Sequence, residues 1–113
     1  MSLNVKTRKV DNAVVVDMSG RLTIGEPVLL LRETVRVLVN DGTRQFILNL
    51  GDVSYIDSSG LAVLIEGMQN IEAYGGKFAL AGLQENVKPI FEIARLDQVF
   101  RIYPDVDSAL SRE

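Results

Sequence analysis

The 113-residue sequence contains no cysteine and no histidine, and each absence excludes a kind of chemistry. Without cysteine there are no disulfides, no thiol catalysis and no thiolate metal sites, which fits a reducing compartment. Without histidine, a Ser-His-Asp hydrolase and a histidine-ligated zinc site are excluded. Aromatic residues make up only 6% of a chain that is 47% hydrophobic, so we expect a core of leucine, isoleucine and valine.

The sequence also lacks a strong positive charge and a long apolar segment. Its formal net charge is −3 and no run of lysine and arginine stands out, so nothing favours nucleic-acid binding. No apolar stretch approaches the roughly 20 residues that span a bilayer. The first eleven residues have no apolar core of the signal-peptide kind. We therefore expect one cytoplasmic domain, residues 1–113, with no direct membrane insertion.

The hydrophobic pattern predicts strands that alternate with helices. The predicted strands are Val5–Val10, Ala13–Met18 (closed by Ser19-Gly20), Phe46–Leu50, Lys77–Ala81 and Val99–Ile102. The predicted helices run from Pro27 to Asn40, from the segment after Asp57 to Gly75-Gly76, from Val87 to Ala94 and from Asp105 to Leu110. The first two strands are too close for a crossover helix and must pair antiparallel. The fold class is therefore α/β, a mixed sheet of four to five strands packed with about four helices.

The most informative segment is Asp57-Ser58-Ser59-Gly60, here called the serine corner. These residue types also form ordinary caps and turns, and in isolation that interpretation is favoured. Here, however, the segment follows a buried strand and opens a strongly periodic helix. It therefore lies at the carboxyl edge of the sheet, where open α/β sheets bind ligands and partners. It also carries two hydroxyls where one cap would suffice.

A phosphate on Ser58 would lie at a helix N-terminus, where backbone N–H groups and the helix dipole favour anions. The phosphate adds about −1.5 to −2 charge near pH 7. The helix end stabilises that charge by roughly 0.3–2 kcal/mol, whereas Asp57 opposes it. We expect the modified domain to stay folded while its surface changes. A binding penalty of about 2.7 kcal/mol already weakens a complex roughly a hundredfold.

With these motifs the chain resembles the STAS domains, and within them the bacterial anti-sigma factor antagonists. The resemblance covers nearly the whole chain and predicts a single STAS-like domain. It rests on the turn Ser19-Gly20-Arg21-Leu22, on Asn49–Val53, on Ile56–Leu61 and on Leu83–Leu96. The sequence departs from the family pattern at Thr23, where an acidic residue is common, and at Ala62, where a second glycine is common.

The resemblance implies that Ser58 is the phosphoacceptor of an anti-sigma factor that is itself a serine kinase. The unmodified antagonist binds that kinase and frees a sigma factor, the phosphorylated antagonist dissociates, and a serine phosphatase resets it. The implied partner-binding residues are Asp57, Ser59 and Gly60 in the corner and Gly20, Arg21 and Leu22 in the neighbouring turn. Arg21 is equally well explained as a solvated loop charge.

Two other functions remain open at this point. As an alternative, a free-standing STAS subunit could act as a scaffold in a transport or stress-signalling assembly, with a serine corner that is never phosphorylated. An enzyme with a serine nucleophile would need a nearby base, and Lys77 and Lys88 are the nearest candidates in sequence. Each is better explained as a surface charge, so we expect no enzyme. We also expect no metal and no cofactor, since no Gly-rich phosphate loop precedes a Lys-Ser/Thr pair.

Overall fold

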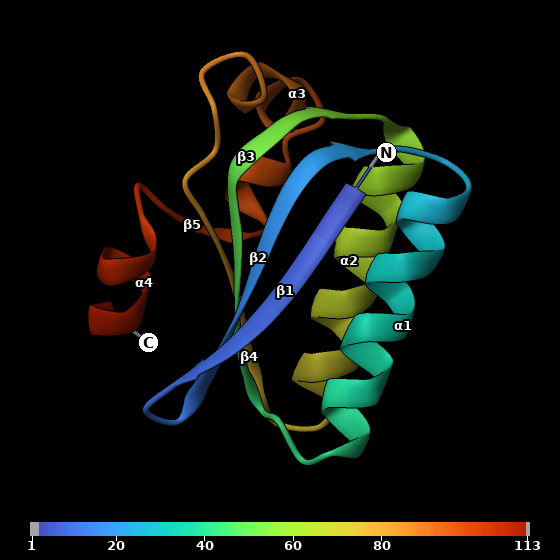
Figure 1. Ribbon diagram of the computed structural model, residues 1–113. Helices are drawn as coiled ribbons and strands as arrows, with labels where there is room; N and C mark the ends of the chain where they lie inside the picture. The colour runs from blue at the N-terminus through green and yellow to red at the C-terminus, as the bar shows by residue number, and fades with distance from the viewer. Residues whose placement is uncertain (1–2, 113) are drawn as a thin grey trace.

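The computed structural model describes residues 3–112, in which a five-stranded sheet lies between two layers of helices (Figure 1). In chain order the elements are β1 (Leu3–Val10), β2 (Ala13–Leu22), α1 (Glu26–Asn40), β3 (Gln45–Ile56), α2 (Ser58–Ala73), β4 (Lys77–Ala81), α3 (Lys88–Ile93), a 3-10 turn (Leu96–Gln98), β5 (Arg101–Tyr103) and α4 (Val106–Arg112). The strands lie side by side in chain order. β1 is antiparallel to β2 and all other neighbours are parallel. The predicted mixed α/β fold is confirmed.

The sheet is buried on both faces, which explains the unbroken apolar run at the start of β2. α1 and α2 cover one face and α4 covers part of the other (Figure 1). Val14 and Val16 belong to the larger core under α1 and α2. Val15 faces the other way and packs with Ile47 and Ala109 in a smaller core under α4. A strand covered on both faces needs apolar residues at consecutive positions, not alternate ones.

Two predicted strand ends are wrong, and the error matters for the site. The pattern closed the second strand at Ser19-Gly20 and the third at Leu50, whereas β2 runs to Leu22 and β3 to Ile56. The two strands stay paired through two register shifts. Such irregularities absorb residues that break the hydrophobic alternation. Because β2 and β3 pair with each other along this extra length, both strands extend to the serine corner.

The helix starts agree with the signals read from the sequence. α1 has Pro27 in its first turn and α3 has Pro89 in its first turn, where the missing N–H costs nothing. After α1 the chain turns at Gly42, which has a φ of 93°. α2 begins at Ser58 directly after β3. The serine corner is thus placed between a buried strand and a long helix, as predicted.

Candidate functional site

The serine corner lies at the carboxyl ends of the parallel strands, where β3 passes into α2. Ser58 is the first residue of α2 and is exposed, whereas Ser59 is half-buried. The Ser58 side chain is therefore held on a rigid element and open to solvent. These are the two properties that a modified residue at this position requires.

Asp57 organises the corner with both of its carboxylate oxygens. Oδ1 accepts a hydrogen bond from the backbone N–H of Gly60 at 2.8 Å, which caps α2. Oδ2 accepts from the backbone N–H of Ile24 at 2.9 Å, in the loop between β2 and α1. Burial by itself would raise the pKa of Asp57, but backbone N–H groups, among them those of Ile24 and Gly60, favour the carboxylate and bring its pKa below the ordinary value. The charged carboxylate thus ties the loop to the helix beside Ser58.

Leu22 and Gly60 support the corner from below. The Leu22 side chain is fully buried, and its carbonyl accepts from the backbone N–H of Asp57 at 3.2 Å. A Cβ on the buried Gly60 would lie 2.3 Å from that same carbonyl oxygen. Both residues are buried in the structure and hold the backbone of the corner in place, and their role as partner contacts stays a prediction.

Arg21 belongs to β2 and not to a loop. Its guanidinium lies 5.3 Å from the centre of the Tyr55 ring on the paired strand β3. Both side chains are exposed, so this cation–π contact holds a positive charge at the surface beside the corner. The half-buried Gly20 contributes backbone, since its carbonyl accepts from the Ser54 hydroxyl at 3.3 Å.

Sequence reasoning missed two apolar residues that flank the serine corner. Ile24 is 74% exposed and is joined to Asp57 through its backbone, and Tyr55 is 43% exposed just before the corner. Exposed apolar groups gathered around a polar centre are typical of protein-binding surfaces. The available signal was an isoleucine in a short loop between Thr23 and Gly25, where nothing in the local pattern calls for an apolar residue.

The described part of the chain offers little other chemistry. Residues 3–112 contain no group of three or more acidic side chains placed to hold a metal ion. In the same range, no helix has both the length and the apolar character of a membrane span. Of the two lysines considered as a base, Lys88 is ion-paired with Glu85 at 2.8 Å. Lys77 opens β4 beside Gln45, at the end of β3 opposite the serine corner.

The fold and the corner together define a small α/β domain that presents a serine at a helix N-terminus. The sequence model of the STAS domain matches residues 4–109, and the chain belongs to the STAS domain family. Two curated relatives from different bacteria share a name. The chain is 32% identical to the anti-sigma-B factor antagonist of Bacillus subtilis, over 90% of this chain and 92% of the relative. It is 28% identical to the protein of the same name from Staphylococcus aureus, over 90% and 94%.

Solved structures show the same fold. The Thermotoga maritima protein tm1081 superposes with a TM-score of 0.89 at 29% identity, over 96% of this chain and 92% of the other. The unphosphorylated anti-sigma factor antagonist SpoIIAA superposes with a TM-score of 0.73 at 21% identity, over 96% of both chains. The phosphorylated form of SpoIIAA, from Bacillus, gives 0.75 at 22% identity, over 96% and 98%.

Proposed function

We propose that this protein is an anti-sigma factor antagonist, a cytoplasmic binding module without catalytic turnover. In this proposal the unmodified domain captures an anti-sigma factor serine kinase, and phosphate on Ser58 ends the complex. One observation carries the proposal: the exposed Ser58 opens α2 on a corner that Asp57 holds to the neighbouring loop. The name shared by the Bacillus subtilis and Staphylococcus aureus relatives supports the role.

The surface around Ser58 supports a charge-controlled interaction. The exposed Ile24 and Tyr55 offer apolar contact area near the corner, and Arg21 adds a cation beside Tyr55. In the transfer, the Ser58 hydroxyl oxygen would bond to the γ-phosphorus of ATP on the kinase while ADP leaves. The hydroxyl proton would pass to a base of the kinase. The phosphate dianion would then replace the neutral Ser58 hydroxyl in the contact surface. Because burying this charge in the complex requires its desolvation, the kinase would bind the phosphorylated form more weakly.

The return step would belong to a separate serine phosphatase, which would transfer the phosphoryl group to water and restore the Ser58 hydroxyl. Ser58 is the outermost residue of the corner, whereas the half-buried Ser59 is less accessible. We therefore expect both the kinase and the phosphatase to act on Ser58 alone. Asp57, Ser59, Gly20 and Arg21 lie beside it as the remaining surface.

The test is phosphorylation by the anti-sigma kinase encoded nearest to this gene, with radiolabelled ATP and intact-mass analysis. We expect one phosphate per chain, lost in Ser58→Ala and retained in the matched control Ser59→Ala. Calorimetric titration of the kinase should give roughly hundredfold weaker binding to Ser58→Asp than to the unmodified protein, if the charge costs about 2.7 kcal/mol. A label that persists on Ser58→Ala would contradict the assignment of the acceptor.

A scaffold function predicts a different set of results. The protein would then co-purify with membrane transport or stress-signalling proteins, and no phosphorylated form would be found in cells. The likeness to the sulfate transporter family protein of Wolinella succinogenes, at 18% identity and a TM-score of 0.73, concerns the fold alone. We therefore keep the antagonist function as the proposal.

A further inference from the structure

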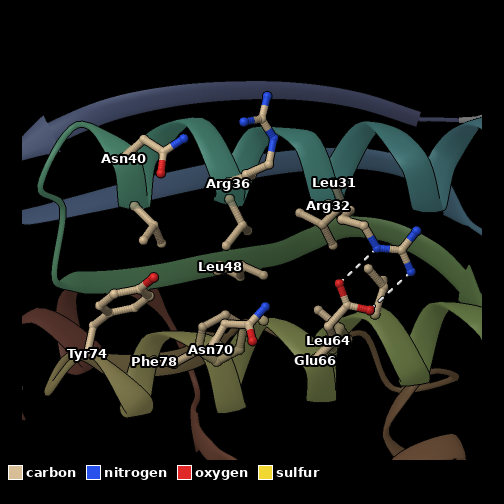
Figure 2. A pocket seen from close by; sticks show the side chains of 14 residues that line it. Leu31, Arg32, Arg36, Asn40, Leu48, Leu64, Glu66, Asn70, Tyr74 and Phe78 are labelled. Atoms are coloured by element: carbon tan, nitrogen blue, oxygen red, sulfur yellow. Dashed lines mark hydrogen bonds and ion pairs between the residues drawn. The ribbon is translucent and has the colours of Figure 1, made fainter.

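A groove of about 340 Å³ runs between α1 and α2, away from the serine corner (Figure 2). Its floor is apolar and is formed by both helices and the sheet beneath them. Residues of the floor include Leu31, Val35, Leu48, Val63, Leu64 and Phe78. The volume lies at the lower end of the roughly 300–1,000 Å³ typical of small-molecule sites, which are mostly apolar with few polar groups.

The groove is open because a glycine occupies the middle of α2. Gly67 is buried and lines the groove, and a Cβ at this position would lie 3.4 Å from Cε2 of Phe78. Any longer side chain here would project into the space between the helices. In a helix, glycine costs about 1 kcal/mol of stability relative to alanine. In this structure, the missing side chain of Gly67 leaves space in the groove between α1 and α2.

An ion pair closes one end of the groove. Arg32 on α1 donates through Nε and Nη2 to the two carboxylate oxygens of Glu66 on α2, at 2.8 and 3.1 Å (Figure 2). The next arginine along α1, Arg36, is paired with Glu33 on its own helix. Both guanidinium groups that line the groove are therefore already neutralised by carboxylates.

The rest of the groove carries neutral polar groups. Asn40 and Tyr74 lie at the end away from the Arg32–Glu66 ion pair, and Asn70 lies between them and that ion pair (Figure 2). All three side chains are exposed, so their polar groups are open to solvent and to a ligand. The Tyr74 ring itself is held by the guanidinium of Arg44, 5.0 Å from its centre. Two carboxamides and a phenol can each donate and accept hydrogen bonds.

We infer that this groove binds a neutral small molecule with an apolar body and an amide or hydroxyl at one end. The apolar body would lie over Val35 and Phe78, and the polar end would meet Asn40, Asn70 and Tyr74. Arg32 and Asn40 are about eight residues apart, so the groove offers roughly 12 Å of length at 1.5 Å per helical residue. An ionised ligand would bind less tightly, because the groove has no unpaired charge to compensate for the desolvation of the ligand's charge.

The test compares three probes of equal length: octanamide, octanoate and octylamine. Each is titrated into the full chain labelled with ¹⁵N and followed by NMR. We expect saturable shifts confined to the groove-facing parts of α1 and α2, with octanamide binding at least about tenfold tighter than either ion. Asn70→Leu and Tyr74→Phe should each weaken octanamide binding by roughly tenfold, the worth of one hydrogen bond.

Gln69→Leu is the matched control, because Gln69 is an exposed amide on the same helix that does not line the groove. Ser58→Ala should bind octanamide like the unmodified protein, so this inference stands or falls separately from the proposed function. Absence of saturable shifts, equal affinity for octanoate, or shifts elsewhere on the molecule would overturn it. So would concentration-dependent broadening over both helices without any response to octanamide, since a second copy of the chain would then fill the groove.

Discussion

Gly60 and Gly67 lie two turns apart in α2 and have opposite surroundings. Gly60 allows the first turn of α2 to touch the end of β2: an added Cβ would meet the Leu22 carbonyl oxygen at 2.3 Å and Cγ2 of Ile56 at 2.7 Å. At Gly67 the nearest atom, Cε2 of Phe78, is 3.4 Å away, an ordinary van der Waals contact. The first glycine is required by a close approach of backbones, and the second is not.

The same substitution at these two positions should therefore change stability in opposite directions. Gly60→Ala forces Leu22 and Ile56 to move, and we expect it to lower the free energy of unfolding by about 1–3 kcal/mol. Gly67→Ala gains helix propensity without a clash, and we expect it to raise the free energy of unfolding by up to about 1 kcal/mol. Urea denaturation measures both, each serving as the control for the other. Equal effects of the two changes would contradict the assigned contacts.

The loop between β2 and α1 and the start of α2 are joined through one side chain. Asp57 bonds the backbone of Gly60 within α2 and the backbone of Ile24 across 33 positions of sequence. The backbone N–H of Asp57 also donates a hydrogen bond to the backbone carbonyl of Leu22. These hydrogen bonds join β2, the loop and α2 next to Ser58.

Removal of this carboxylate should loosen the loop as well as the helix. We expect Asp57→Ala to cost about 1 kcal/mol of stability through the lost helix cap. The backbone amide of Ile24 should also exchange with solvent faster, because its acceptor is gone. Hydrogen exchange followed by NMR measures this directly.

Asp105→Ala is the matched control for that experiment. Asp105 accepts from the backbone N–H of Ser108 at 2.8 Å at the start of α4 and makes no contact with the serine corner. The control should lose a similar local cap but leave exchange at Ile24 unchanged. Unaltered protection of Ile24 in Asp57→Ala would show that the loop is held by something else.

Acidic groups set how the stability of the whole molecule responds to pH. Among residues 3–112, the carboxyl groups with a pKa below the ordinary value include Asp17, Glu33, Asp57, Asp105 and Glu85. For Asp17, burial acts in the opposite direction but is outweighed by hydrogen bonds from Arg8 at 2.7 Å and Asn49 at 2.8 Å. The unfolded chain binds protons at these groups at a higher pH than the folded chain does.

Stability should therefore be fully present above the ordinary carboxyl pKa values and be lost as pH falls through the lower folded values. We expect the free energy of unfolding to be nearly constant from about pH 5 to pH 8, since the chain has no histidine. Below about pH 4 it should decline. Urea unfolding at several pH values tests this, with Asp17→Asn plus Asp57→Asn as a comparison whose decline should be shallower. Stability that rises on acidification would refute the assigned directions.

Local patterns in the sequence determined much of this molecule. Hydrophobic periodicity predicted the alternation of strands and helices, and Pro27 and the serine corner marked helix starts that the structure has at those places. The absence of cysteine and histidine by itself restricted the chemistry open to this chain. These features depend on neighbouring residues, whose spacing and composition are visible in the chain itself.

Only the tertiary structure decided the lengths of β2 and β3, the burial of Leu22 and the second hydrogen bond of Asp57. The groove between α1 and α2 at Gly67 is also visible only in the tertiary structure. Each of these depends on contacts between segments far apart in the chain. The physical reason is that these backbone groups and side chains interact with residues that are distant in sequence. Local hydrophobic periodicity does not indicate which distant residues those are.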